Sequence, residues 1–267
     1  MVVFPNCKIN LGLRILDKRE DGFHNLETIF YPIKICDALE IIKEDSSNNI
    51  QFTSSGNKID GDETNNLCVK AYYLLKKDFP ELPSIKMHLH KTIPIGAGLG
   101  GGSADAAFAL QLINTKFKLN LSATQLSNYA LQLGSDCPFF ILNKPCIATG
   151  RGEILNEIDI DLSGNTAIII NPGIHINTGW AFSQLATFNG SSDKLDPANQ
   201  TTWKNDFEPI VFNQYPEIKK IKDMLCNSGA YYASMSGSGS TVYGLFDKKA
   251  PSIPTFPSHY YVKTVQM

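Results

Sequence analysis

Hydrophobic and polar residues alternate along the N-terminal part of the chain. This two-residue period is present at residues 8–16, 26–33 and 38–42, and turn-forming residues occupy 17–22. Side chains point alternately to the two faces of a β-strand, so the period predicts three successive strands.

The period becomes helical further along the chain. Apolar residues recur every three or four positions at 67–75, and the apolar segments 104–113 and 123–133 continue this pattern. We therefore expect three helices, the second opening with Ser103 as its N-cap. Residues 85–89 alternate again and predict a half-buried strand.

The C-terminal part of the chain combines both periods. The expected elements are a compact apolar strand at 166–171, a largely helical segment at 207–225, two strands around a glycine-serine turn within 231–246, and a last strand at 260–266. Mixed helices and strands without an internal repeat predict an α+β fold. A boundary before the strand at 166 gives two domains, residues 1–160 and residues 161–267.

The composition allows a packed core and gives no strong overall charge. The 267 residues are 43% hydrophobic and 19% charged, which excludes a disordered or collagen-like chain. Lysine and arginine number 24 against 26 aspartate and glutamate, for a net charge of −2. We therefore expect neither nucleic acid nor a membrane as a partner, and an anionic ligand must be held by local geometry.

The cysteines and the apolar segments indicate the compartment. None of the six cysteines has a C-x-x-C neighbour, which predicts free thiols in a reducing environment. The N-terminus has no basic segment followed by an apolar stretch, and no apolar run approaches the ~20 residues that span a bilayer. We expect a cytoplasmic protein.

A glycine-rich loop is the most informative segment of the chain. Between Pro94 and Ser103 five glycines fall within seven positions, after a predicted strand and before a predicted helix. Glycines let backbone N–H groups approach a ligand closely, and a helix N-terminus attracts negative charge, so the loop predicts a phosphate site. A flexible surface linker is the alternative, but a linker is not expected between a strand and a strongly apolar helix.

The loop does not fit the two common nucleotide-binding motifs. Residues 96–101 match G-x-G-x-x-G, but no acidic residue lies near position 120, where a dinucleotide-binding fold contacts the ribose. The G-K-[ST] ending of a P-loop is also absent, because Ser103 and Ala104 follow Gly102. The remaining interpretation is an ATP-binding loop of another kind.

A lysine and an aspartate are candidates for catalysis. Lys8 begins the first predicted strand, where Asn10 points to the same side, and Asp136 lies in a turn between a helix and a very apolar strand at 137–140. If the two charges meet, Lys8 would keep Asp136 ionised while Asp136 accepts a proton from a substrate hydroxyl. The residues alone leave two alternatives open. Lys8 could be a lysine at the end of a strand whose ammonium group reaches solvent, and Asp136 could only form a turn or cap a helix.

Several motifs together resemble a superfamily of small-molecule kinases that includes galactokinase, homoserine kinase and mevalonate kinase. The superfamily motifs are K-I-N-L from Lys8, the loop at 94–107, and S-G-S-G-S-T from Ser236. The motifs that resemble the 4-diphosphocytidyl-2-C-methyl-D-erythritol kinase family within it are D-G-F-H-N-L-E-T from Asp21, G-S-D-C-P-F-F from Gly134 and G-R-G-E from Gly150. The resemblance covers nearly the whole chain in order.

The resemblance implies a fold, a reaction and a set of site residues. The N-terminal domain should be similar to ribosomal protein S5 domain 2 and the C-terminal domain to ferredoxin, with the active site in the cleft between them. The implied reaction is ATP-dependent phosphorylation of the 2-hydroxyl of a small molecule, a cytidine diphosphate-linked methylerythritol, in non-mevalonate isoprenoid biosynthesis. The implied catalytic residues are Lys8 and Asp136. The implied ATP-binding residues are Asn66, Lys91, Pro94, Ile95, Gly96, Ala97, Gly98, Leu99, Gly100, Gly101, Gly102, Ser103 and Ala104. The implied substrate-binding residues are Asn10, Phe23, His24, Thr178 and Phe182.

The resemblance also suggests how the substrate and the metal are held. Cytosine is expected to stack between Phe23 and Phe182, with His24 at its edge. Phe23 keeps the ring of the family's usual tyrosine without its hydroxyl, and the spacing before Lys8 is one residue longer than usual. Mg²⁺ is expected with ATP, and Ser103 is the only ligand that the sequence suggests.

Two other functions stay open beside this one. A different kinase of the superfamily, of the homoserine kinase type, is disfavoured by the D-G-F-H segment. A non-catalytic nucleotide-binding regulator is disfavoured by the presence of both Lys8 and Asp136. His88 and His90 could suggest a metal site, but with no third ligand nearby in sequence we expect solvated or structural histidines.

Overall fold

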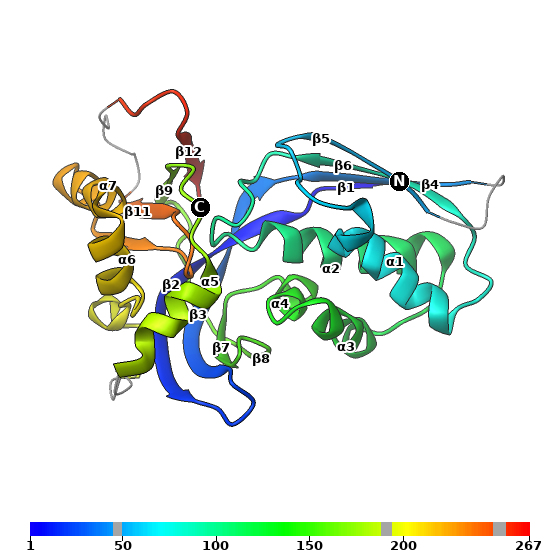
Figure 1. Ribbon diagram of the computed structural model, residues 1–267, viewed down its shortest axis with the longest axis horizontal. Helices are drawn as coiled ribbons and strands as arrows, with labels where there is room; N and C mark the ends of the chain where they lie inside the picture. Colours follow the sequence, from blue (N-terminus) through cyan, green and yellow to red (C-terminus); the bar gives the residue numbers. More distant parts are fainter. Residues whose placement is uncertain (45–49, 188–193, 248–254) are drawn as a thin grey trace. The chain divides into compact units, whose positions relative to one another are not determined.

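The computed structural model describes residues 1–44, 50–187, 194–247 and 255–267 (Figure 1). The chain divides into two compact units, each made of several stretches of sequence. The first unit comprises Met1–Cys7, Ile35–Ile95 and Gly100–Lys144, and the second comprises Lys8–Lys34, Gly96–Leu99 and Pro145–Met267. Both units combine helices with sheets, which confirms the predicted α+β class.

The first unit packs helices against a four-stranded sheet with the order β1-β4-β6-β5. Its strands are β1 (Val2–Val3), β4 (Ala38–Lys43), β5 (Gln51–Gly56) and β6 (Ile85–Lys91). Its helices are the 3-10 turn η1 (Glu63–Asn65), α1 (Leu67–Asp78), α2 (Gly101–Phe117), α3 (Ala123–Leu133) and α4 (Cys137–Leu142). Every second residue of β6 is buried, as the alternation at 85–89 predicts, and these side chains share a core with α1 and α2.

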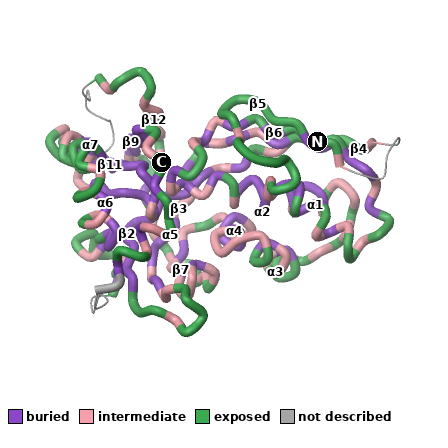
Figure 2. The backbone as a smooth tube through the Cα atoms, viewed as in Figure 1, coloured by how far each residue is buried: buried purple, intermediate pink, exposed green. Residues whose placement is uncertain are grey.

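The second unit contains two further four-stranded sheets, ordered β2-β3-β7-β8 and β10-β11-β9-β12. The strands of the first are β2 (Asn6–Lys18), β3 (His24–Cys36), β7 (Cys146–Gly150) and β8 (Ile154–Glu157). The strands of the second are β9 (Thr166–Asn171), β10 (Tyr232–Met235), β11 (Val242–Phe246) and β12 (Tyr261–Gln266). The helices are α5 (Thr178–Ser183), η2 (Gln184–Thr187), η3 (Gln200–Thr202), α6 (Glu208–Gln214) and α7 (Pro216–Asn227). Strands β9 and β11 are buried along their whole length (Figure 2), which explains why the strand predicted at 166–171 has no polar alternation.

Two segments differ from the structure that their sequence predicts. Residues 137–140 form a helix, α4, and not a strand, because a short apolar run fits either element and Pro138 is favoured in a first helical turn. The segment 207–225 is largely helical, as predicted, but it is divided into two helices, since Pro216 has no N–H to continue α6 and instead begins α7.

The prediction that Ser103 caps α2 is also wrong. The helix begins at Gly101, and Gly100, with a φ of 70°, is its N-cap. Glycine adopts this left-handed conformation without steric cost, so the helix starts inside the glycine run. Ser103 therefore lies in the first turn of α2.

Two further findings concern the cysteines and the helices. All six cysteines are free thiols, as predicted, and four of them are buried. Within the described part of the chain, no helix is both long and apolar enough to cross a membrane.

Candidate functional site

Three segments that are distant in sequence are joined by hydrogen bonds in the second unit. The backbone N–H of Lys8, in β2, donates to the carbonyl oxygen of Leu99 at 3.0 Å. The hydroxyl of Ser236, in the turn between β10 and β11, donates to the carbonyl oxygen of Gly98 at 2.8 Å. The loop 96–99 is thus fixed on one side by β2 and on the other by the serine-glycine turn.

Glycines allow the loop and the turn to pack backbone against backbone. A Cβ at Gly98, where φ is +82°, would overlap the carbonyl oxygen of Ser236. A Cβ at Gly239 would overlap the backbone of Ala97 and Gly98. The sequence predicts that Gly98 lets a phosphate group approach the backbone. The structure shows that Gly98 is also required for the loop to pack against the serine-glycine turn.

The N-terminus of α2 follows directly after this loop. The Ala104 N–H donates to the Gly100 carbonyl at 2.9 Å. Gly100 is the N-cap and has no side chain that could accept from the first N–H groups of the helix. Gly102 is exposed, and a Cβ there would meet nothing within 4 Å. At Gly101 a Cβ would lie 2.9 Å from Ile93 Cγ2, so this glycine is packed. The helix therefore presents an open, positively polarised end, which favours negative charge.

Asp136 lies next to the first turn of α2 within the first unit. It is the half-buried N-cap of α4, and the next residue, Cys137, is completely buried. Burial raises the pKa of the Cys137 thiol to about 12, and the neighbouring Ser103 side chain opposes this shift. The carboxylate singled out from the sequence and the open helix end are thus parts of one local structure.

Lys91 is held between two carboxylates in the interior of the first unit. Its ammonium group donates to Asp37 Oδ2 and, at 2.7 Å, to Asp105 Oδ2. All three side chains are less than 5% exposed. Asp37 also accepts backbone N–H groups from Thr92 and Ile93, at 2.6 and 2.9 Å. Lys91 therefore ties β6 to the first turns of α2, where Asp105 is located.

The two carboxylates of this triad are not equivalent. Among the described residues Asp105 Oδ1 has no hydrogen-bond partner, whereas both oxygens of Asp37 accept. Burial raises the pKa of Asp105 to about 7, although the Lys91 ammonium opposes this shift. Burial alone would lower the pKa of Lys91, but the two carboxylates raise it above its ordinary value.

The remaining residues of the predicted ATP site differ in exposure. Asn66 is the N-cap of α1 and accepts the Cys68 N–H at 2.9 Å. In the loop, Ile95 and Gly96 are exposed. Pro94 is half-buried, and Ala97, Leu99 and Ala104 are buried. The buried members support the loop and the exposed members are accessible to a ligand.

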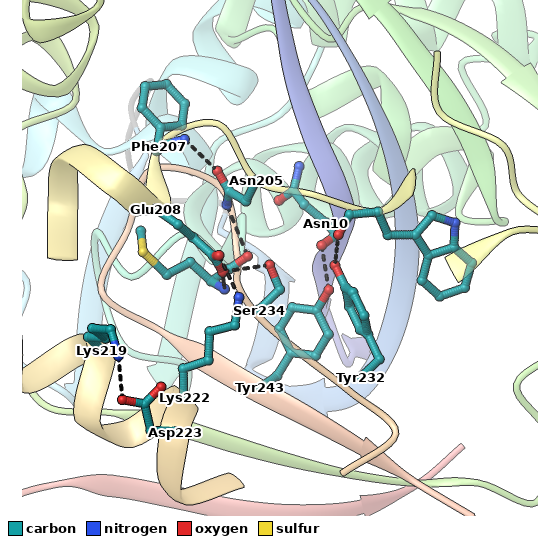
Figure 3. Close-up of polar contacts among 12 residues, drawn as sticks. Asn10, Asn205, Phe207, Glu208, Lys219, Lys222, Asp223, Tyr232, Ser234 and Tyr243 are labelled. Carbon is teal, nitrogen blue, oxygen red and sulfur yellow. Dashed lines mark hydrogen bonds and ion pairs between the residues drawn. The ribbon is translucent and has the colours of Figure 1, made fainter. Parts of the chain in front are cut away.

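Lys8 and Asn10 form a buried polar pair on β2. Lys8 Nζ donates to Asn10 Oδ1 at 2.6 Å and lies 4.7 Å from the centre of the Phe30 ring. The Tyr243 hydroxyl donates to the Asn10 carbonyl oxygen at 2.6 Å (Figure 3). Asn205 donates to the Gly237 carbonyl at 2.8 Å and so supports the serine-glycine turn. Sequence reasoning missed Tyr243 and Asn205, because no local pattern indicates which distant backbone group a buried polar side chain will meet.

The predicted substrate residues cluster in the second unit. The rings of His24 and Phe182 stack with centroids 5.0 Å apart and an angle of 23°. Burial lowers the pKa of His24, which favours the neutral imidazole. Phe23 is 53% exposed, and its ring lies 5.0 Å from the guanidinium carbon of Arg151, a residue without a predicted role. Thr178 shares a hydrogen bond of 3.2 Å with Ser238, in the serine-glycine turn.

His88 and His90 lie on the exposed face of β6 and contact hydroxyl groups. Thr53 Oγ1 is 2.8 Å from His88 Nδ1, and Ser55 Oγ is 2.9 Å from His90 Nδ1. Over the described ranges, no group of three or more His, Cys, Asp or Glu side chains could hold a metal ion.

The chain matches two protein families over separate ranges. The GHMP kinases N terminal domain matches residues 66–144, and the GHMP kinases C terminal matches residues 182–253. A 4-diphosphocytidyl-2-C-methyl-D-erythritol kinase of Azobacteroides pseudotrichonymphae genomovar. CFP2 is 49% identical over 96% of this chain and 97% of the relative. The enzyme of the same name from Bacteroides fragilis is 50% identical over 92% of each chain.

Solved structures with the same fold include kinases of several substrates. A crystal structure of 4-(cytidine 5'-diphospho)-2C-methyl-D-erythritol kinase matches with a TM-score of 0.80 and 26% identity over 100% of both chains. A homoserine kinase from Cytophaga hutchinsonii matches with a TM-score of 0.70 over 97% of this chain and 94% of that chain. At 15% identity, the second match shows a common fold alone.

Proposed function

The chain belongs to the 4-diphosphocytidyl-2-C-methyl-D-erythritol kinase family of the GHMP kinases, and we propose that it phosphorylates the 2-hydroxyl of 4-diphosphocytidyl-2-C-methyl-D-erythritol with ATP, in non-mevalonate isoprenoid biosynthesis. It is a small-molecule kinase. The observation that carries the proposed reaction is the set of hydrogen bonds by which Lys8 contacts Leu99 and Ser236 contacts Gly98, because these bonds join three different superfamily motifs. The curated relatives favour this reaction over the homoserine kinase type and over a non-catalytic regulator.

ATP is proposed to place its phosphates at the start of α2. The uncapped helix end and the open space at Gly102 support this placement. The loop residues 94–104 would contact the nucleotide through their backbone. Asn66 and Lys91 are also proposed to serve the nucleotide site, and the ion pair of Lys91 with Asp105 suggests that Lys91 acts by holding α2 in place.

Asp136 is proposed as the general base of the transfer. It would accept the proton of the substrate 2-hydroxyl, whose oxygen forms a bond to the γ-phosphorus of ATP while the bond to ADP breaks. Its position at the start of α4, a helix that packs against α2, supports this role. Lys8 is proposed as the second catalytic residue, which stabilises the negative charge of the deprotonating hydroxyl.

Mg²⁺ is proposed to accompany ATP, because the transfer requires neutralisation of the γ-phosphate charge. Ser103, in the first turn of α2, is the proposed protein ligand. Phosphate oxygens of ATP would supply further ligands to the ion.

The cytidine part of the substrate is proposed to bind at Phe23, His24 and Phe182. The exposed ring of Phe23 offers a surface for stacking, and the neutral imidazole of His24 can both donate and accept a hydrogen bond. Asn10 and Thr178 are proposed to contact the same substrate. A base between Phe23 and Phe182 would require His24 to leave its present stack on Phe182.

The proposed domains are an ATP-binding domain at residues 1–160 and a C-terminal domain at 161–267. A cytoplasmic location is also proposed, and the free thiols support it, because they persist in a reducing compartment.

A coupled assay of ADP release tests the function. The purified protein is given ATP, Mg²⁺ and either 4-diphosphocytidyl-2-C-methyl-D-erythritol, homoserine or mevalonate. We expect ADP release with the cytidine compound alone. Turnover of homoserine or mevalonate instead would assign the protein to another reaction of the superfamily.

A further inference from the structure

Thr28 holds a completely buried position beside the polar pair on β2. Its backbone is fixed by pairing of β3 with β7, opposite Ala148. Its hydroxyl donates to the Gly12 carbonyl oxygen at 2.6 Å. Gly12 has a φ of +74°, and a Cβ there would lie 2.7 Å from Leu195, so this carbonyl group belongs to a closely packed, well-defined backbone.

The proton of Thr28 determines which atom of Asn10 faces it. A hydroxyl has one proton, and since Thr28 gives it to Gly12, Oγ1 can only accept from Asn10. Asn10 Nδ2 donates to this oxygen at 2.8 Å. The amide oxygen of Asn10 must then point the other way, where it accepts from Lys8 Nζ at 2.6 Å.

The opposite orientation of this amide would disrupt the site. If the amide were rotated by 180°, its NH₂ group would face the Lys8 ammonium, so that two donors would meet without an acceptor. Lys8 and Asn10 are 3% and 1% exposed, so bulk water is excluded from compensating for the lost bond. The position of the Lys8 ammonium thus depends on a hydroxyl that it does not touch.

We infer that Thr28 is a positioning residue of the proposed kinase, which orients Asn10 and thereby holds Lys8 in its catalytic position. This inference rests on the proposed function. The backbone of Asn10 is held separately by the Tyr243 hydroxyl, at 2.6 Å (Figure 3). Loss of the Thr28 hydroxyl should therefore remove what fixes the orientation of the Asn10 amide, and so weaken its bond to Lys8 Nζ, without displacing β2.

Two substitutions at Thr28 separate the hydroxyl from the shape of the side chain. Thr28→Val keeps the branched shape and removes the hydroxyl, whereas Thr28→Ser keeps the hydroxyl. We expect Thr28→Val to lower kcat about tenfold or more with the KM for ATP changed less than about twofold, and Thr28→Ser to stay within about threefold of the unmodified protein. Thr166→Val is the matched control, since it removes another buried threonine hydroxyl, one that accepts from Gln266 on β12. It should lower the melting temperature without lowering kcat.

The Asn10 side chain gives a second measurement that does not depend on activity. With ¹⁵N-labelled asparagine, one NH₂ proton of Asn10 should exchange slowly with water in the unmodified protein and in Thr28→Ser. A fast-exchanging Asn10 amide in the unmodified protein would overturn the inference even if Thr28→Val did not fold. Equal loss of kcat in both variants, or normal kcat in Thr28→Val, would also overturn it. If the unmodified protein releases no ADP with the cytidine compound while the amide is protected as expected, the proposed function fails and the orientation of Asn10 stands.

Discussion

The Ser236 hydroxyl donates a hydrogen bond to the Gly98 carbonyl oxygen across 138 positions of sequence, at a distance of 2.8 Å. The Ser236 carbonyl oxygen in turn occupies the place where a Cβ of Gly98 would lie. The two residues therefore hold the glycine-rich loop and the serine-glycine turn in direct backbone contact. A side chain at position 98 cannot be accommodated unless the two segments separate.

Gly98→Ala should destabilise the protein more than the left-handed backbone alone explains. Gly164 provides a matched control, because its φ of +81° is close to the +82° of Gly98 but a Cβ there meets nothing within 4 Å. Gly164→Ala should cost about 1–2 kcal/mol of unfolding free energy. Gly98→Ala should cost at least about 1 kcal/mol more, as measured by urea denaturation. Equal losses would show that the overlap with Ser236 is relieved easily.

Gly102→Val should abolish nucleotide binding while the fold is kept. Because the space at Gly102 is open, the valine side chain would not clash with the protein, and it would meet a phosphate group bound as proposed. Calorimetric titration with ATP measures the affinity, and thermal melting checks the fold. Gly101 is a poorer test, since a side chain there would disturb Ile93 and Lys91. Unchanged ATP affinity in folded Gly102→Val would place the phosphates elsewhere.

Asp136→Asn should lower kcat by roughly 100-fold or more with a modest change in KM, as expected when a general base is lost. Lys8→Met should be comparably damaging, because it removes the buried ammonium group. Asp161→Asn is a suitable control, since this exposed aspartate accepts the Ser163 N–H in a turn. Near-normal kcat in both test variants would show that other residues carry the chemistry.

Asp105 should make the stability of the protein depend on pH. Its pKa rises from the ordinary 3.8 to about 7 on folding, so between these values the folded chain binds a proton that the unfolded chain has released. The free energy of unfolding therefore falls as pH rises from about 4 to 7. Asp105→Asn should remove this dependence, so its stability relative to the unmodified protein should increase over that range in urea titrations.

Asp37→Asn is the comparison for this pH experiment. Asp37 accepts the Lys91 ammonium and two backbone N–H groups, so its replacement should destabilise the protein at every pH. Parallel pH profiles for Asp105→Asn and the unmodified protein would show that Asp105 stays ionised throughout.

Phe23→Ala should raise the KM for the cytidine substrate by roughly 5- to 150-fold, which corresponds to the ~1–3 kcal/mol of base stacking on an aromatic ring. Because Phe23 is 53% exposed, the melting temperature and the KM for ATP should change little. Phe4, which is 64% exposed in the first unit, gives the control substitution Phe4→Ala. A large fall in melting temperature with an unchanged KM would make Phe23 a structural residue.

Local pattern predicted most of the sheet strands but not every element. The strand at 166–171 has the predicted bounds because a short, fully apolar run between polar segments matches a buried central strand. The run at 137–140 looks the same in sequence yet forms a helix, since the choice depends on Pro138 and on the neighbouring helices. Period alone cannot separate these two cases.

The supporting residues of the candidate site could not be predicted from the sequence. Phosphate-binding glycines are recognisable because their spacing is local. The carbonyl groups that accept from Thr28, Tyr243 and Asn205 lie between 16 and 233 positions away, and only the folded chain brings them together. The contact of Arg151 with the Phe23 ring could not be predicted for the same reason.

The interleaved course of the chain has a consequence for synthesis on the ribosome. Residues 96–99 belong to the second unit, although the stretches on both sides of them belong to the first. Their contacts with Ser236 and Gly239 cannot form until about nine-tenths of the chain has been translated. A nascent chain that ends at residue 160 would carry every glycine of this loop without the turn that shapes it. If ATP binds the loop as proposed, its full affinity should appear only after Ser236 and Gly239 have been added.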